Sequence, residues 1–236
     1  TPFARKSSFY LTVYEYLDDW YSLGSPNIGI DHDLAKIRST SKIYELFTLY
    51  KLIDALQSDG WKVVDSIVNT SYKSFAPSQV NFRKEDSCLN LYYEKKILGF
   101  NENTQHNDLV ALNKNEPKNQ YNYYNPDFVI VKQKQDDVSY YILDSKYSSS
   151  NTLRNYKVLE KLYEKYFSNM ATYNQVDNIL EKHSIKCVNA IHPFGEKPLT
   201  KWSNKLPPIT PDISSILLSK DVNNLNKFLN LINQKI

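Results

Sequence analysis

Two short apolar runs, Asp127–Val131 and Val138–Leu143, most constrain how this chain can fold. Both are rich in Val, Ile, Phe and Tyr, which favour strands, and a polar segment at 133–137 separates them. This pattern predicts a β-hairpin. A hairpin places the start of its first strand beside the end of its second, so residues at those two points are brought together.

Other periodic segments surround this hairpin. Apolar residues at helical spacing predict a helix over 41–59, and alternating patterns predict strands over 61–68 and 88–98. After the hairpin, an apolar stripe predicts one long helix over 152–183, followed by a strand over 187–193. This order predicts an α/β fold with a mixed central sheet flanked by helices and a right-handed crossover into the last strand.

The remaining segments set the expected domain boundaries. Residues 1–37 are aromatic-rich and are expected to form an extension that docks on another surface. Residues 38–195 are expected to form the core, which includes a long polar loop at 101–125. Residues 196–236 predict a Pro-rich segment and then an amphipathic helix over 223–236.

Composition excludes several classes of protein. The chain has 236 residues, of which 41% are hydrophobic and 14% aromatic, and no apolar run reaches the ~18 residues of a membrane helix. The aromatic content also argues against global disorder. Two cysteines and four scattered histidines lack the spacing of a disulfide framework or a zinc site.

The net charge of +3 permits a nucleic-acid partner without requiring one. The N-terminal residues carry no export signal, so the expected location is cytoplasmic, with no membrane partner.

Charged residues stand at the end of the hairpin where its two strands meet. Asp127 opens the first strand, and Asp144 and Lys146 close the second. Residues i and i+2 of a strand share a face, so Asp144 and Lys146 should project together while Ser145 faces the other way. Two converging carboxylates suit Mg²⁺, which activates water for phosphate-ester hydrolysis, and a neighbouring lysine can orient that water.

Glu45 offers a third carboxylate. It lies on the same helical line as Leu49, Leu52 and Leu56, so it is expected to face the sheet. A carboxylate that faces the sheet is removed from water, so it needs a hydrogen-bonding or charged partner, or a metal ion. A glutamate in the first turn of a helix is also favoured by the helix dipole without any metal, so both interpretations stay open.

The order and type of these residues resemble the PD-(D/E)XK nuclease superfamily. The matching positions are Glu45, Pro126-Asp127 and Asp144-Ser145-Lys146. Three local sequences are further similar to the nuclease domain of McrC-type restriction proteins: Tyr44-Glu45, Leu143-Asp144-Ser145-Lys146-Tyr147 and Met170-Ala171-Thr172-Tyr173. The resemblance covers roughly residues 38–195. It departs at Ser145, where a small apolar residue is more usual, and in the long loop at 101–125.

The resemblance implies a restriction-endonuclease-like core. It also implies that the chain is a metal-dependent DNA endonuclease, which serves as the catalytic subunit of a restriction system and works with an AAA+ GTPase motor. The implied cofactor is Mg²⁺, with Mn²⁺ as a substitute, and the implied partners are double-stranded DNA, the motor and a second copy in a homodimer. The implied metal ligands are the three acids and the backbone carbonyl of Ser145, with Lys146 positioning the water.

DNA contacts are expected outside these residues. Arg38, Arg154 and Lys157 are candidates for phosphate contacts. Lys157, Lys161 and Lys165 recur at i, i+4 and would form a basic ridge, although interleaved glutamates fit an ordinary solvated face equally well. Two other functions stay open: a non-catalytic DNA-binding or assembly module of the same fold, and a stand-alone repair-type nuclease.

Overall fold

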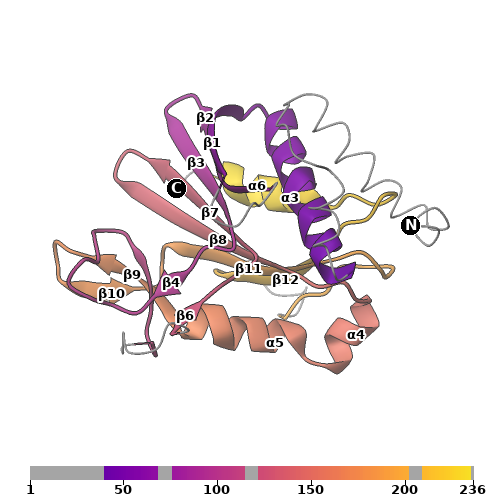
Figure 1. Ribbon diagram of the computed structural model, residues 1–236. Helices are drawn as coiled ribbons and strands as arrows, with labels where there is room; N and C mark the ends of the chain where they lie inside the picture. The colour runs from indigo at the N-terminus through magenta and orange to yellow at the C-terminus, as the bar shows by residue number, and fades with distance from the viewer. Residues whose placement is uncertain (1–39, 69–75, 115–121, 202–208, 235–236) are drawn as a thin grey trace.

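A mixed seven-stranded sheet forms the centre of the molecule in this computed structural model, which describes residues 40–68, 76–114, 122–201 and 209–234 (Figure 1). The strand order is β1-β2-β3-β7-β8-β11-β12. The strands are β1 (Lys62–Val68), β2 (Pro77–Lys84), β3 (Ser87–Tyr93), β7 (Phe128–Lys134), β8 (Asp137–Ser145), β11 (Ile185–His192) and β12 (Asp212–Leu217).

The direction of the strands divides the sheet in two. Strands β1, β2, β3, β7 and β8 pair antiparallel in succession, whereas β8, β11 and β12 run parallel. The predicted hairpin is therefore confirmed as β7–β8, and it occupies the middle of the sheet. The α/β class with a mixed central sheet is confirmed as well.

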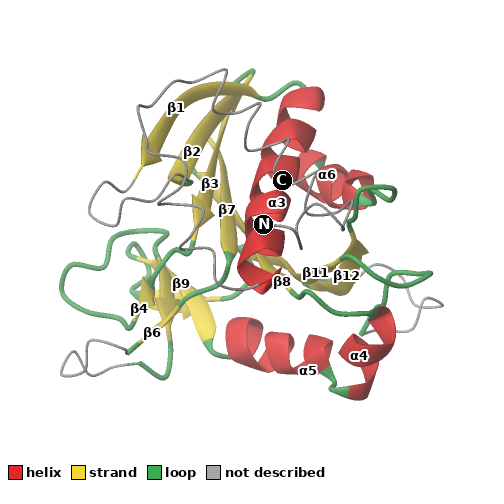
Figure 2. Ribbon diagram, turned by 45° about the vertical axis from the view of Figure 1, so that its right-hand side comes forward, coloured by secondary structure: helices red, strands yellow, loops and turns green. Residues whose placement is uncertain are grey.

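Helices cover both faces of this sheet (Figure 1, Figure 2). On one face lie α3 (Thr40–Ser58) and α6 (Leu225–Asn233), which share a hydrophobic cluster with the sheet. On the other face lie α4 (Ser150–Asn155), α5 (Val158–Leu162) and the π-helix η3 (Tyr163–Ser168). The side chains of β8 alternate between the two clusters, as a strand buried on both faces requires.

The single long helix predicted over 152–183 is wrong. Lys157 has a left-handed backbone (φ 50°) that separates α4 from α5, and the helical region ends at Ser168. The chain then forms a hairpin of β9 (Met170–Asn174) and β10 (Ile179–Glu181). Strand β9 also pairs with β5 (Leu109–Ala111), a partner supplied by the segment at 101–125. Long-range pairing therefore overrides the apolar spacing, and Val176 of the expected stripe is 85% exposed.

The segment at 101–125, expected to be one loop, also contains β6 (Tyr123–Tyr124). Strand β6 pairs with β4 (Ile97–Leu98), and the two form a short ribbon beside the large sheet. Strand β2 was not predicted. The region from β2 to β6 therefore contains more strands than the sequence pattern predicts.

The core continues beyond residue 195, where the sequence placed its boundary. Strand β12 is the seventh strand of the sheet and pairs parallel with β11 along its whole length. Helix α6, predicted over 223–236, packs into the same cluster as α3 through Phe228 and Ile232. The expected docking extension at 1–37 lies outside the described residues.

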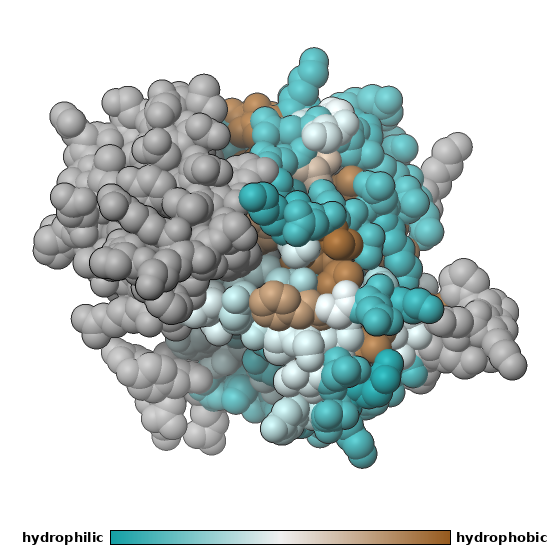
Figure 3. Space-filling view, turned by 90° about the vertical axis from the view of Figure 1, so that its right-hand side faces the viewer, coloured by the Kyte–Doolittle hydropathy of each residue, from teal (hydrophilic) through white to brown (hydrophobic). Residues whose placement is uncertain are grey.

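The described helices include none that is both long and apolar enough to cross a membrane. Figure 3 shows one face of the molecule, on which apolar side chains form a broken line among polar ones. Most of the large apolar side chains of the described part are instead buried in the two clusters on either side of the sheet.

Candidate active site

The register of the β7–β8 hairpin brings the two predicted aspartates together. Phe128 pairs with Leu143, so Asp127 and Asp144 follow at the same end of the two strands. Asp127 Oδ2 accepts a hydrogen bond from the backbone N–H of Ser145 at 2.6 Å. Asp127 and Asp144 therefore lie at the same end of the hairpin, whereas a shared metal ion stays a prediction.

Asp144 is buried, with a side chain only 4% exposed, and both of its carboxylate oxygens have partners. Oδ1 forms an ion pair with Lys146 Nζ, as the i, i+2 spacing predicts. Oδ2 accepts a hydrogen bond from the hydroxyl of Tyr166 at 2.7 Å. Lys146 is itself held in place, because its backbone N–H donates to the carbonyl of Ile191 in β11 at 2.7 Å. These contacts stabilise a charged carboxylate inside the fold.

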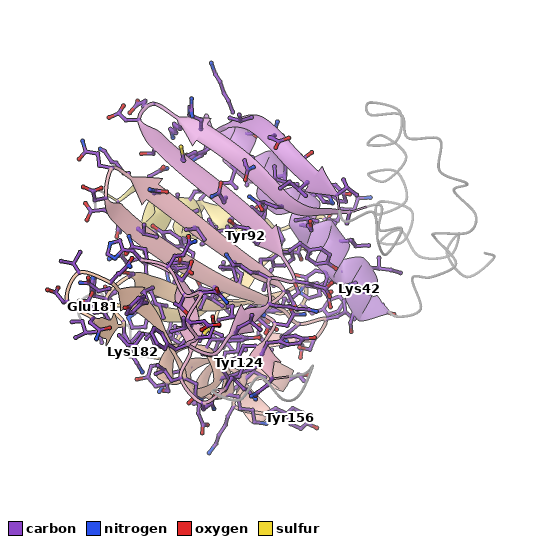
Figure 4. All side chains as sticks on the ribbon, turned by 60° about the vertical axis from the view of Figure 1, so that its left-hand side comes forward. Lys42, Tyr92, Tyr124, Tyr156, Glu181 and Lys182 are labelled. Atoms are coloured by element: carbon purple, nitrogen blue, oxygen red, sulfur yellow. The ribbon has the colours of Figure 1, made fainter. Side chains whose placement is uncertain are left out.

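Glu45 lies near the same end of the sheet, in the second turn of α3 rather than the first. Its side chain is 18% exposed, and Oε2 accepts hydrogen bonds from Lys42 Nζ at 2.9 Å and from the Tyr93 hydroxyl at 3.2 Å. Lys42, labelled in Figure 4, also donates to Glu94 at 2.7 Å. The backbone N–H of Glu94 donates in turn to the carbonyl of Asp127. The acid on α3 is thus tied to the strand that carries the second acid.

Charge interactions join these residues into one cluster. Burial raises the pKa of Asp127 to about 6, and the negative charge of Glu45 adds to this effect. The ammonium of Lys146 opposes the shift, and so does the hydrogen bond from Ser145. Burial also lowers the pKa of Lys146, while Asp127 and Glu45 act in the opposite direction. Glu45, Asp127 and Lys146 are therefore close enough to influence one another's charge.

Oxygen donors of this kind suit a hard cation, because carboxylates are the ligands that Mg²⁺ prefers. In the part of the chain that the structure describes, however, no three His, Cys, Asp or Glu side chains are gathered tightly enough to hold an ion. Lys146 and Tyr166 engage the two carboxylate oxygens of Asp144. Asp127 and Glu45 fit the donor chemistry, although Lys42 forms an ion pair with Glu45. The three-acid metal site, including the Ser145 carbonyl, stays a prediction.

Two residues of the cluster were not identified from the sequence. Tyr166 is fully buried in η3 and donates to Asp144, and Lys165 Nζ donates to the Tyr166 hydroxyl at 2.9 Å. Lys165 is exposed and Tyr166 is buried among apolar side chains, as helical spacing gives, but no pattern in the sequence indicates that the Tyr166 hydroxyl contacts Asp144.

The remaining candidates lie apart from this cluster. Arg154 and Lys157 are exposed on and after α4, and Arg38 lies outside the described residues. Lys157, Lys161 and Lys165 do not share one helix, because Lys157 precedes α5 in a left-handed conformation and Lys165 lies in η3. All three lysines are exposed, and η3 follows α5 directly, so the basic ridge and a DNA contact by Arg154 or Lys157 both stay predictions.

Comparisons with protein-family models, with curated proteins and with solved structures gave no match to this chain.

Proposed function

We propose that this chain is a metal-dependent DNA endonuclease that hydrolyses phosphodiester bonds at the cluster of Glu45, Asp127, Asp144 and Lys146. One observation carries the proposal. The hairpin register places Asp127 beside Asp144, and the ammonium of Lys146 contacts that second carboxylate. Two acids and a lysine at one end of a central sheet are what this hydrolysis requires.

Each residue has a role that its surroundings support. Asp127 and Glu45 supply the oxygen donors that would hold Mg²⁺ or Mn²⁺, and Asp144 joins them when Lys146 releases its oxygen. When bound, the cation supplies a nucleophilic water and offsets charge on the phosphate. Lys146, freed from Asp144, positions that water through its ammonium. Tyr166 orients Asp144 by donating to Oδ2.

The likeness of the site sequences to McrC-type proteins supports the biological setting. We propose that the chain acts in the cytoplasm as the catalytic subunit of a restriction system and is delivered to duplex DNA by an AAA+ motor. A net charge of +3 supports this arrangement, because tight binding to duplex DNA needs several well-placed cations.

Cleavage of plasmid DNA tests the function directly. The purified chain with Mg²⁺ should cut supercoiled DNA slowly at physiological salt, and much faster when an AAA+ partner and its nucleotide are supplied. The readout is conversion of supercoiled to nicked and linear plasmid, with EDTA as the matched control. Robust sequence-specific cutting without a partner favours a stand-alone nuclease, whereas no cutting under any condition contradicts the endonuclease.

A second candidate function rests on a different observation. Both oxygens of Asp144 already have protein partners, Lys146 and Tyr166. A non-catalytic DNA-binding or assembly module of the same fold would keep such a closed network as structure. Divalent-cation binding separates the two candidates, because the non-catalytic module has no need of it.

The affinity for a divalent cation should rise with pH up to about pH 6 and then level off. The pKa of Asp127 is raised to about 6, above its ordinary value of 3.8. Below pH 6 the folded protein therefore carries a proton on this carboxylate, and the cation must displace it. Affinity should increase about tenfold per pH unit in that range. Calorimetric titration with Mn²⁺ from about pH 5 to pH 8 measures the effect.

The control is Asp127→Asn, which removes the titrating group. This variant should bind Mn²⁺ weakly and lose the rise in affinity below pH 6. A wild-type affinity that stays constant across the same range would show that Asp127 does not hold the cation.

A further inference from the structure

The hydroxyl of Tyr166 lies between an ammonium and a carboxylate. It accepts a hydrogen bond from Lys165 Nζ at 2.9 Å and donates to Asp144 Oδ2 at 2.7 Å. A lysine ammonium can only donate and an ionised carboxylate can only accept, whereas a tyrosine hydroxyl does both with a single hydrogen. The hydrogen bond from Lys165 therefore engages the oxygen of Tyr166 as an acceptor and favours the direction in which its hydrogen points to Asp144.

Both side chains of this hydrogen-bonded chain are held in place. The Tyr166 ring is fully buried in the apolar cluster on its side of the sheet. The ring of Tyr124, labelled in Figure 4, packs edge-on against it at 6.3 Å between ring centres. The ammonium of Lys165 lies 4.6 Å from the centre of the Tyr166 ring, whose face attracts it. Turning the ring away from Asp144 would break these contacts.

Lys165 also belongs to the candidate active site through its charge. Burial lowers the pKa of Lys165, and the negative charge of Asp127 opposes that shift. Burial is likewise the main cause of the lowered pKa of Lys146, and the ammonium of Lys165 lowers it further. Two ammonium groups therefore act on Asp144, Lys146 directly at Oδ1 and Lys165 through Tyr166 at Oδ2.

The proposed hydrolysis asks different things of these two ammonium groups. Lys146 must leave Oδ1 of Asp144 so that this oxygen can reach the cation. A buried carboxylate that loses its ion-pair partner is strongly destabilised. The hydrogen bond from Tyr166 to Oδ2 does not have to break, so it can hold the carboxylate while Oδ1 is free.

We propose that Lys165 is a positioning residue, which acts through the Tyr166 hydroxyl to hold Asp144 for cation binding once Lys146 has moved. The inference rests on the proposed function, and it assigns Lys165 a role other than the phosphate contact of the basic ridge. Because Lys165 reaches Asp144 through Tyr166, the two residues should behave as one unit when they are substituted.

The test combines calorimetric titration with Mn²⁺ and single-turnover cleavage of plasmid DNA. Lys165→Met and Tyr166→Phe each remove one link and keep the shape of the side chain. Each should lower the Mn²⁺ affinity and the cleavage rate by about 10–100-fold, the usual cost of losing a group that orients a metal ligand. The double variant should lose no more than the larger single loss. Lys165→Arg, which keeps the charge and the donors, should retain most of the affinity and rate.

Lys182→Met is the matched control. Lys182, also labelled in Figure 4, lies 5.4 Å from the centre of the Phe167 ring in the same π-helix, and it donates to the carbonyl of Ser168 at 2.7 Å. This variant disturbs η3 through a similar contact and should keep the wild-type Mn²⁺ affinity. The KM for DNA should stay unchanged in all variants, whereas the loss of a phosphate contact would raise it.

Several outcomes would overturn the proposal: a wild-type Mn²⁺ affinity in Lys165→Met, a double variant whose loss is the product of the two single losses, an equal loss in Lys182→Met, or a raised KM with an unchanged rate. The absence of Mn²⁺ binding by the wild type would overturn both this role and the metal-dependent nuclease. If the Mn²⁺ affinities change as expected but no DNA is cut, the endonuclease fails while the positioning role stands.

Discussion

Lys146→Ala should reduce the single-turnover rate of DNA cleavage by about 10²–10³-fold, the cost of removing one preorganised charge from a transition state. Among the described residues, Lys146 is the cation in ion-pair contact with Asp144. Its backbone is fixed independently, through the hydrogen bond to Ile191 in β11, so the strand should keep its path without the ammonium. Rapid-quench measurement of nicked plasmid, with the motor and nucleotide present, gives the rate.

A loss of folding must be separated from a loss of chemistry in this variant. Removing the ammonium leaves Asp144 buried with Tyr166 as its partner, which costs stability. Thermal melts and duplex binding in Ca²⁺ should show a folded protein that still binds DNA. Lys134→Ala, an exposed lysine at the other end of β7, is the matched control and should cleave normally. If Lys146→Ala keeps most of the wild-type rate, this lysine has no role in hydrolysis.

Phe228→Ala should lower the free energy of unfolding by about 3–5 kcal/mol, the usual cost of deleting a buried aromatic ring. Phe228 of α6 is 1% exposed, and its ring packs edge-on against Tyr141 of β8 at 6.0 Å between ring centres. The cavity would lie in the cluster that α6 shares with α3. Urea denaturation followed by circular dichroism measures the change.

Asn226→Ala is the control for that substitution, because Asn226 lies in the same helix and is exposed. It should change stability by less than about 0.5 kcal/mol. A similarly small change for Phe228→Ala would mean that α6 does not belong to the core, leaving β12 as the only described element after residue 195 in the central sheet.

The sequence was sufficient to locate the hairpin and its acids, because local patterns determine both. Alternating apolar residues specify β7 and β8, and hairpin geometry then requires Asp127 to lie beside Asp144. The position of Lys146 follows from the period of two along a strand. Glu45 was placed on the buried side of α3 by the spacing of its leucines, although the helix starts earlier than expected.

Features that depend on contacts between residues far apart in the sequence could not be predicted from local patterns. Strand β9 forms because β5, some 60 residues earlier in the chain, provides its backbone partner, while its own apolar spacing also fits a helix. The contact of Tyr166 with Asp144 joins η3 to β8, 22 residues apart in the chain, so no local pattern indicates it. Strand β12 was not predicted either, and it pairs with β11 across an intervening segment.

The mixed sheet also has a consequence for the order in which a growing chain can assemble on the ribosome. All four proposed catalytic residues are synthesised before β11, yet the backbone of Lys146 is anchored by Ile191 at the end of that strand. The antiparallel part from β1 to β8 consists of neighbouring pairs, whereas β11 must return across α4 and α5 to reach β8. Parallel pairing across such a connection forms late. A nascent chain therefore carries the hairpin and its acids before the backbone of Lys146 has its anchor, which forms only when β11 has emerged.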